Sequence, residues 1–421
     1  MGWELDLVLI FAAIVALLAS GLQIPFAIGL TAVGLLLWSG GVGELNALGL
    51  VVWGGANSFV LTAIPLFILM AEILIVSDIS ARLYRGLARL TRHWPGGLLH
   101  TNIAGCAVFS AVCGSSIATA AAISRVALPQ VRAHGYDMRM ACGSLAAGGT
   151  LGILIPPSGA MIIYGVLTET SIVRLFAAGI LPGLLLAALF MAYIAAASRR
   201  RPDRAAAGRL VADLLLLVPF LVLIAAVIGS MYLGWATPTE AAAVGVLAAI
   251  AIGAGAGDLT FRRLFQALHG TVRVSGALLF LIAMAQTLSY ALSISGLAAG
   301  LAGAVAGLNL DPTLFLILLM VLYAILGCIM DGVAMTMITV PVLFPVLQAL
   351  GIDPVFFGVL LVVMMELGLI TPPFGLNLFV IQQISGEPMI RVLRGSLPFC
   401  VIILGVVALL LAFPGLASGP W

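Results

Sequence analysis

Long apolar stretches separated by short polar ones run along the whole chain. A helix of about 20 apolar residues crosses a bilayer, and the stretches at 5–20, 22–38 and 57–77 are the first of this kind. The others lie at 98–131, 140–167, 172–198, 210–232, 239–255, 270–293, 312–351, 354–384 and 389–413. The pattern predicts an all-α polytopic membrane protein.

Arginines at helical spacing follow the third stretch. Arg82, Arg85, Arg89 and Arg92 recur every three or four residues, so they share one face of a helix. A helix with a basic face and an apolar face lies in the membrane interface. Residues 81–94 are therefore predicted to form an interfacial helix.

Two adjacent prolines interrupt the apolar stretch at 140–167. Pro156 and Pro157, in the sequence GILIPPSG, lack the backbone N–H that a helix uses, and their rings clash with the preceding turn. In lipid, the backbone groups that they free have no water to bind. The stretch at 354–384 contains the related sequence GLITPPFG at 368–375. Each stretch is predicted to be a broken helix.

The two proline motifs belong to an internal repeat. They are 216 residues apart (368 − 152), and this offset pairs further residues of the two halves: Pro129 with Pro345, Gly135 with Gly351, Asp137 with Asp353, and Ser115 with Asp331. Matches in register indicate a duplication. The predicted parts are a first repeat at 1–198, a basic linker at 199–209 and a second repeat at 210–421.

The interrupted stretches at 98–131 and 312–351 are predicted to be re-entrant hairpins. Each repeat then has five crossings, an odd number, so the two repeats are inverted relative to each other. With the linker placed in the cytoplasm by the positive-inside rule, most other arginines fall on that side. The loops at 39–45, 167–171, 232–238 and 296–310 fall outside and contain no arginine. Both termini are predicted to be periplasmic.

Inverted repeats with broken helices are typical of secondary transporters, which bind substrate and ions at such breaks near the midplane. The predicted tips are CGSS (113–116) and IMDG (329–332), and each pairs with one proline break. Hydroxyls, carbonyls and a carboxylate suit Na⁺. A carboxylate inside the membrane is costly unless it is paired or ligating, so Asp331 is an ion or gating residue, with a structural cap as the alternative.

Other polar residues leave their roles open. Arg125 either faces an anionic substrate or extends to the cytoplasm. Glu72 and Glu366, within apolar stretches, either pair with arginine or accept structural hydrogen bonds. The cysteines and histidines lack zinc spacing, so no transition metal and no cofactor are expected.

Composition narrows the function classes. The chain is 63% hydrophobic and 8% charged, against about 25% charged residues in soluble proteins. Its net charge of +2 gives no reason to expect a nucleic-acid partner.

A membrane protease needs a Ser–His or paired-Asp constellation, and no histidine neighbours Ser115 or Ser116 in the predicted membrane interior. An enzyme is therefore not expected, and no pore lining indicates a channel.

Residues 114–158, from GSSIATAAAISRV to GILIPPS, and residues 327–380, from GCIMDGVAMT to GLITPPFGLNLFV, resemble the large membrane subunit of tripartite ATP-independent periplasmic transporters, the DctM type. The resemblance covers essentially the whole chain. It implies an inverted repeat with an elevator-like transport domain, in a bacterial inner-membrane importer of organic acids such as C4-dicarboxylates, sialic acid, keto acids and sugar acids. Na⁺ is the implied coupling ion.

The resemblance also implies partners and site residues. The partners are a periplasmic solute-binding protein and a small four-helix membrane subunit, expected as a separate chain. The residues predicted to bind substrate are Ser116, Asp331 and Asn377, together with Arg125, whose substrate role would be specific to a subfamily. The implied Na⁺ residues are Ser115, Ser116, Thr119, Gly152, Ile155, Pro156, Asp331, Gly332, Gly368, Thr371 and Pro372.

Two departures from the family pattern are visible. Many relatives have three serines in the first tip, where this chain has Gly114, Ser115 and Ser116. Arg125 often aligns with a small residue. A stand-alone dicarboxylate/Na⁺ symporter without a binding protein stays open as the alternative function.

Overall fold

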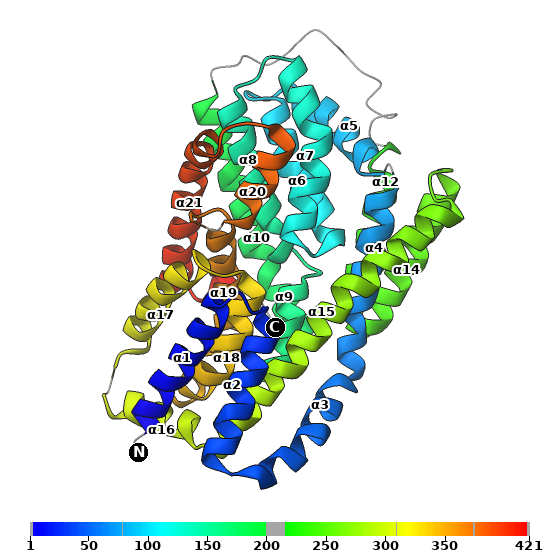
Figure 1. The fold of residues 1–421 in the computed structure, drawn as a ribbon. Helices are drawn as coiled ribbons and strands as arrows, with labels where there is room; N and C mark the ends of the chain where they lie inside the picture. The colour runs from blue at the N-terminus through cyan, green and yellow to red at the C-terminus, as the bar shows by residue number, and fades with distance from the viewer. Residues whose placement is uncertain (1–2, 78, 199–214, 309, 374, 419–421) are drawn as a thin grey trace.

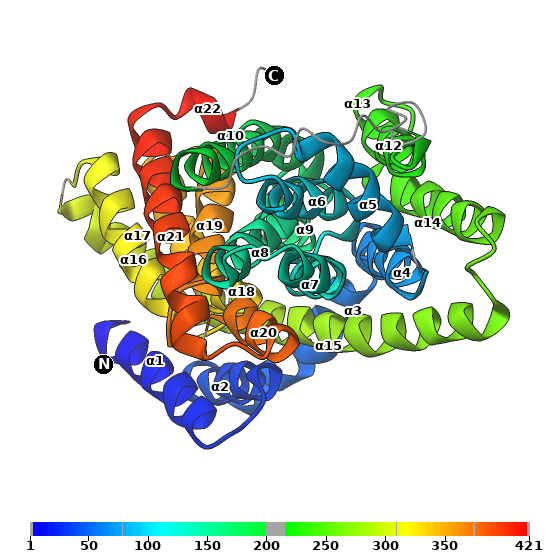
Figure 2. The same ribbon diagram turned by 90° about the horizontal axis from the view of Figure 1, so that it is seen from above.

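The computed structural model describes residues 3–77, 79–198, 215–308, 310–373 and 375–418, and all regular secondary structure in these ranges is helical. Figure 1 shows an elongated bundle in which most helices run along one axis, and Figure 2 shows the same bundle from above. The prediction of an all-α polytopic protein is confirmed. Residues 199–214, which include the predicted linker, lie outside the described ranges.

The first half of the chain begins with two helices joined by a short turn. Its elements are α1 (Trp3–Ala19), α2 (Ile24–Ser39), η1 (Val42–Ala47), α3 (Leu48–Ala56), η2 (Phe59–Thr62), α4 (Ala63–Val76), α5 (Ile79–Thr91), α6 (Leu98–Cys113), α7 (Ser116–Ala133), α8 (Met138–Thr150), η3 (Leu151–Ile153), α9 (Gly159–Thr168) and α10 (Ile172–Ala197). The helix α3 was not predicted from the sequence.

The second half repeats this order of elements in outline. Its elements are α12 (Val218–Ile224), η4 (Ala225–Gly229), α13 (Ser230–Tyr232), α14 (Pro238–Gly255), α15 (Phe261–Ile294), α16 (Leu297–Gly307), α17 (Pro312–Gly327), α18 (Gly332–Ala349), α19 (Pro354–Leu369), α20 (Leu376–Ser385), α21 (Met389–Ala412) and α22 (Gly415–Ser418).

Helix length separates two kinds of membrane segment. In the described ranges, six helical segments are long and apolar enough to cross a bilayer, among them α10, α15 and α21. The arms of the hairpins and of the proline breaks are mostly shorter apolar helices of 10–17 residues. Most arms are short because a proline pair or a tip ends the helix, while α18, the returning arm of the second hairpin, is long enough to cross.

The two hairpins enter the bundle from opposite ends. In Figure 1, α6 and α7 occupy the upper half of the molecule, while α17 and α18 occupy the lower half. Both hairpins turn near the middle, beside α9. This is the arrangement expected for inverted repeats.

Matched positions of the two halves have matched local geometry. Gly135 and Gly351, paired by the offset of 216, both adopt left-handed backbone at φ 66° and 68°. Asp137 and Asp353, also paired, cap the N-termini of α8 and α19. The same residue types therefore end the returning arm of each hairpin and begin each broken helix.

The segment at 296–310 corrects one prediction. It was expected to be an external loop, but residues 297–307 form α16, which packs beside α18 with Leu297 buried. The segment has no proline inside the helix, and alanine and leucine favour helix. Tertiary packing supplies the stability that its glycines reduce. The helix at 270–293 is also longer than expected, since α15 begins at Phe261.

Aromatic rings pack the centre of the bundle around α19. The Phe357 ring lies 6.2 Å from the ring of Tyr164 on α9 and 6.2 Å from that of Tyr323 on α17. All three side chains are fully buried. This cluster joins α9 of the first half to α17 and α19 of the second half.

Candidate functional site

The first hairpin turns at a glycine in left-handed backbone. Gly114 has φ 62°, and Ser115 then begins α7, its hydroxyl accepting a hydrogen bond from the Ala118 N–H at 3.5 Å. A Cβ on Gly114 would lie 2.6 Å from the carbonyl oxygen of Pro157. Only glycine fits this turn, because it allows positive φ and the close backbone contact. The tip therefore lies directly against the first proline break.

The second hairpin turns before Asp331, which caps α18. One carboxylate oxygen, Oδ1, accepts hydrogen bonds from the N–H groups of Val333 at 2.9 Å and Ala334 at 3.0 Å. Ser115 and Asp331, paired by the offset of 216, are thus both N-caps. The structural cap proposed for Asp331 is present, while its other oxygen, Oδ2, makes no hydrogen bond within the described ranges.

Both tips line one cavity of about 370 Å³. Ser115 and Ser116 come from the first tip, and Asp331 and Gly332 come from the second. The rest of the lining comes from α4, α9, α15, α19, α20 and nearby residues. The fold therefore brings together, from opposite halves of the chain, the two motifs that the sequence marked as a pair.

Each tip also touches its own proline break through a glycine. A Cβ on Gly152 would lie 2.8 Å from the Ser115 carbonyl oxygen, and one on Gly368 would lie 2.8 Å from the Gly327 carbonyl oxygen. These backbone atoms cannot move aside as a side chain can. At each contact, called a tip–break joint below, a glycine lets a carbonyl of the hairpin approach the broken helix.

The breaks leave carbonyl oxygens without their helical partners. In a continuous α-helix the Gly152 and Gly368 carbonyls would bond the N–H groups of residues 156 and 372, which are prolines and have none. The Gly368 carbonyl instead accepts from nearer residues, at 3.3 Å from the Thr371 N–H and from the Ile370 N–H that caps α19. Beside it lies a small cavity of about 10 Å³, lined by Gly327, Asp331, Gly368 and neighbouring residues. That is room for about one water-sized sphere.

Asn377 joins the second break to the first tip. Its buried Nδ2 donates to the Ser116 hydroxyl oxygen at 2.8 Å and to the Ala146 carbonyl at 3.1 Å. The Asn377 Oδ1 atom and the buried Thr119 hydroxyl have no hydrogen-bond partner in the described ranges. Ser116, Thr119 and Asn377 were all predicted site residues, but the contact between Asn377 and Ser116 was not predicted.

Other predicted residues lie off the cavity. Arg125 is exposed on α7, nine residues and about 13 Å of helix beyond Ser116. Thr371 donates its hydroxyl to the Leu367 carbonyl at 2.6 Å. Ile155 packs against Gly183 of α10. Pro156 is buried, whereas its counterpart Pro372 is exposed.

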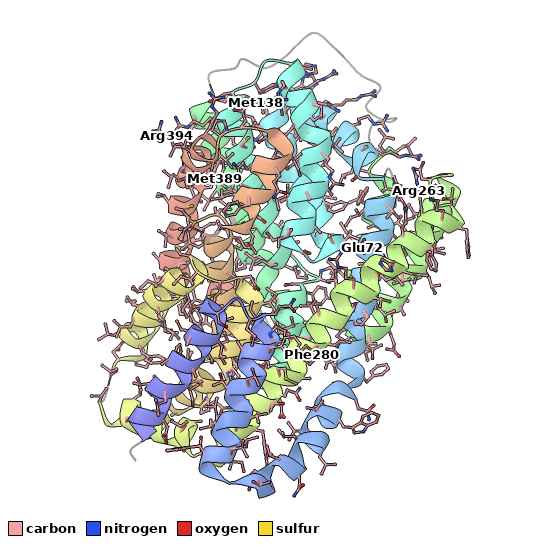
Figure 3. The ribbon with its side chains drawn as sticks, viewed as in Figure 1. Glu72, Met138, Arg263, Phe280, Met389 and Arg394 are labelled. Atoms are coloured by element: carbon pink, nitrogen blue, oxygen red, sulfur yellow. The ribbon has the colours of Figure 1, made fainter. Side chains whose placement is uncertain are left out.

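Two acidic side chains inside the bundle lack an ion pair in the described ranges. Glu366 on α19 is fully buried, and neither carboxylate oxygen has a hydrogen-bond partner there. Glu72 on α4 lies against α15, where a Cβ on Gly270 would meet its Oε2 at 2.8 Å, and Figure 3 labels it beside that helix. The alternative of an arginine partner is not seen for either residue.

The residues that form the apolar wall of the cavity could not be predicted from the sequence. Phe67 and Ile68 on α4 and Val274 and Leu278 on α15 line it, yet such residues are ordinary in any membrane helix. No cluster of His, Cys, Asp and Glu that could hold a metal ion occurs in the part of the chain that the structure describes.

The chain is similar to one characterised family over nearly its whole length. Residues 11–416 match the family described as "Tripartite ATP-independent periplasmic transporter, DctM component". Among curated proteins, the chain is 32% identical to the C4-dicarboxylate TRAP transporter large permease protein DctM of Pseudomonas aeruginosa, over 89% of each chain. It is 32% identical to the 2,3-diketo-L-gulonate TRAP transporter large permease protein YiaN of Escherichia coli, over 96% of each chain.

A relative with a different named substrate is equally similar. The sialic acid TRAP transporter large permease protein SiaM of Vibrio cholerae is 32% identical over 94% of each chain. Among solved structures, the YdaH transporter of Alcanivorax borkumensis has a similar fold, with a TM-score of 0.65 over 91% of each chain at 19% identity. The curated relatives named here are permeases.

Proposed function

Because the chain belongs to the DctM family of tripartite ATP-independent periplasmic transporters, we propose that it is the large permease subunit of a Na⁺-coupled importer of an organic acid. A periplasmic solute-binding protein delivers the acid, and a separate small four-helix membrane subunit completes the complex. The complex lies in the bacterial inner membrane with both termini of this chain periplasmic. The observation that supports the proposal best is the single cavity lined by both hairpin tips.

Na⁺ binds at the two tip–break joints in this proposal. Unwound backbone carbonyls and half-helix ends coordinate Na⁺ in transporters built from broken helices. The Cα atoms of Gly152 and Gly368, whose carbonyls lack their helical partners, lie against the carbonyl oxygens of Ser115 and Gly327. At the second joint, the Asp331 carboxylate lines the adjoining small cavity. Na⁺ there also neutralises a charge that is costly inside a membrane.

Transport proceeds by an elevator movement in this proposal. The hairpins and broken helices, which contact one another through the tip–break joints and Asn377, move as one body. Helices α4 and α15, whose side chains form the opposite wall of the cavity, belong to the scaffold. Closure of the cavity requires both ions and acid, because each stabilises the closed state.

The test is uptake into liposomes that contain the large permease, the small subunit and the binding protein. The variant Asp331→Asn keeps a side-chain oxygen for the Val333 and Ala334 N–H groups, and asparagine caps helices as well as aspartate does. The fold is therefore retained while the charge is lost. We expect Na⁺-driven uptake to fall by about tenfold or more, which corresponds to about 1.4 kcal/mol or more.

The matched control is Asp311→Asn, since Asp311 caps α17 through one oxygen, Oδ1, as Asp331 caps α18, and does not line the cavity. This variant should transport at the wild-type rate. Uptake that persists unchanged without a Na⁺ gradient, or in Asp331→Asn, contradicts the proposal. Full uptake without the binding protein would instead favour the stand-alone symporter.

A further inference from the structure

The cavity between the tips has one polar end and a large apolar wall. Ser115, Ser116 and Asp331 are the polar side chains among the described residues that line it, and Asp331 is the charged one. No arginine, lysine or histidine contributes to this lining. The apolar wall comes from several helices and includes Phe67, Ile163, Val274, Leu278, Val333 and Leu376.

The first tip offers hydrogen-bond donors that the protein itself does not use. The Ser116 hydroxyl oxygen accepts the bond from Asn377, so its own hydrogen is left to donate. The backbone N–H groups of Ser116 and Ile117, in the first turn of α7, have no acceptor within the described ranges. Donors of this kind at a helix N-terminus bind a carboxylate, and the helix dipole adds to the attraction.

The second tip is already supplied with a carboxylate. Asp331 fills the N-terminus of α18 with its own side chain, which accepts from the Val333 and Ala334 N–H groups. Its negative charge also faces the same cavity. Na⁺ at the second joint offsets this charge but leaves the Val333 and Ala334 N–H groups bound to Asp331. A second carboxylate of the substrate would therefore lack these donors, and a buried carboxylate without hydrogen bonds is costly.

The remaining wall disfavours any further polar group. A carboxylate or hydroxyl buried against apolar side chains without a hydrogen bond costs several kcal/mol. Apolar chain carbons in the same place are stabilised in proportion to the surface that is removed from water. The two effects act together to select a substrate with one charged end.

We propose that the acid bound in this cavity is a monocarboxylate with an apolar chain, rather than a dicarboxylate or a polyhydroxy sugar acid. Its carboxylate lies at the N-terminus of α7, by Ser115, Ser116 and Ile117, and its chain lies against α4 and α15. This assignment rests on the proposed function and specifies the substrate class of that same site.

The experiment compares three acids that share a six-carbon chain. The large permease is purified with its small subunit, and its thermal unfolding is followed in Na⁺ buffer at increasing concentrations of hexanoate, adipate or gluconate. We expect hexanoate to bind at least about tenfold more tightly than adipate, which adds a second carboxylate, and than gluconate, which adds hydroxyls. Equal or tighter binding of adipate or gluconate overturns the assignment, as does absence of stabilisation by hexanoate.

A variant pair on α15 tests where the chain lies. Val274→Thr places a hydroxyl in the cavity wall with little change of volume, so hexanoate affinity should fall by about fivefold. Val272→Thr, on the same helix at a position 72% exposed and outside the lining, should bind hexanoate as the wild type does. Equal effects of the two variants contradict this placement.

Uptake separates this assignment from the proposed function. In the full liposome system, Na⁺-driven uptake of adipate with no uptake of hexanoate overturns the assignment and leaves the Na⁺-coupled importer standing. Uptake of every acid at the same rate without Na⁺ overturns the importer, while the binding preference measured by unfolding still decides the assignment.

Discussion

At the scale of the residue, a few polar atoms connect the two halves of the chain. Asn377, in the second half, donates to Ser116 and to the Ala146 carbonyl in the first. Asp331 caps its own helix and faces the cavity. These are buried or half-buried groups whose hydrogen bonds are strong in a low-dielectric interior and costly to lose.

The variant Asn377→Asp tests this connection. It keeps the shape of the side chain but removes the donors, so the Ala146 carbonyl loses this hydrogen bond and a negative charge approaches Ser116. We expect the free energy of unfolding to fall by about 1–3 kcal/mol, measured as a lower melting temperature, together with weaker binding of the transported acid.

Gln383→Glu is the matched control, because it makes the same amide-to-acid change at an exposed position of the same helix. It should leave both the melting temperature and acid binding unchanged. If Asn377→Asp melts and binds like the control, the hydrogen bonds of Asn377 do not join the halves.

At the scale of the element, each hairpin is fixed to its broken helix by a tip–break joint. The joints use Gly152 against Ser115 and Gly368 against Gly327. Close-packed backbones leave no room for a methyl group, and cores that are overpacked are destabilised. The hairpin and the break of each half therefore form one unit.

Gly152→Ala and Gly368→Ala should each lower the free energy of unfolding by about 1–3 kcal/mol and abolish most Na⁺-driven uptake. Melting temperature and liposome uptake measure the two effects. Gly276→Ala on α15 serves as the control, because a Cβ there meets no atom within 4 Å. Alanine in a helix is favoured over glycine by about 1 kcal/mol, so this variant should be at least as stable as the wild type. Wild-type uptake by Gly152→Ala would mean that the joint is not needed for transport.

At the scale of the whole molecule, charge marks one end of the bundle. Figure 3 shows Arg394 beside Met138 and Met389 at the upper end, and Arg263 toward that end of α15. The amphipathic α5 lies at this end too, with Leu83, Tyr84 and Leu87 buried and Arg85 and Arg89 exposed. Arginine-rich loops stay in the cytoplasm, so this end is predicted to be cytoplasmic.

Labelling of single cysteines tests the orientation. Four native cysteines are buried, and Cys328→Ala removes the half-buried fifth. In intact spheroplasts, a membrane-impermeant maleimide should label Trp235→Cys, at a site 79% exposed in a predicted periplasmic loop. It should label Arg262→Cys only after the membrane is permeabilised. The reverse pattern would show that the topology is opposite to the predicted one. Equal labelling of both sites in spheroplasts that exclude the reagent would contradict the prediction that the two sites lie on opposite sides of the membrane.

Local chemistry explains which predictions from the sequence succeeded. Pro156, Pro157 and Pro372 end helices wherever they occur, since they lack an N–H. Gly114 and Asp331 shape the tips through backbone conformation and capping, which depend only on neighbours in the chain. Helix α16 was missed because its glycines weaken the helical signal of its alanines and leucines, and packing on α18 supplies the missing stability.

The sequence by itself determined the helical class, the two tips, the two breaks and their pairing at an offset of 216 residues, because these follow from hydrophobic length, proline and helix capping. Only the tertiary structure decided which groups meet. It placed both tips on one cavity, directed Asn377 to Ser116, buried Pro156 while exposing Pro372, and left Arg125 away from the cavity. These outcomes depend on contacts between residues more than a hundred positions apart, and such contacts are set by the packing of whole helices.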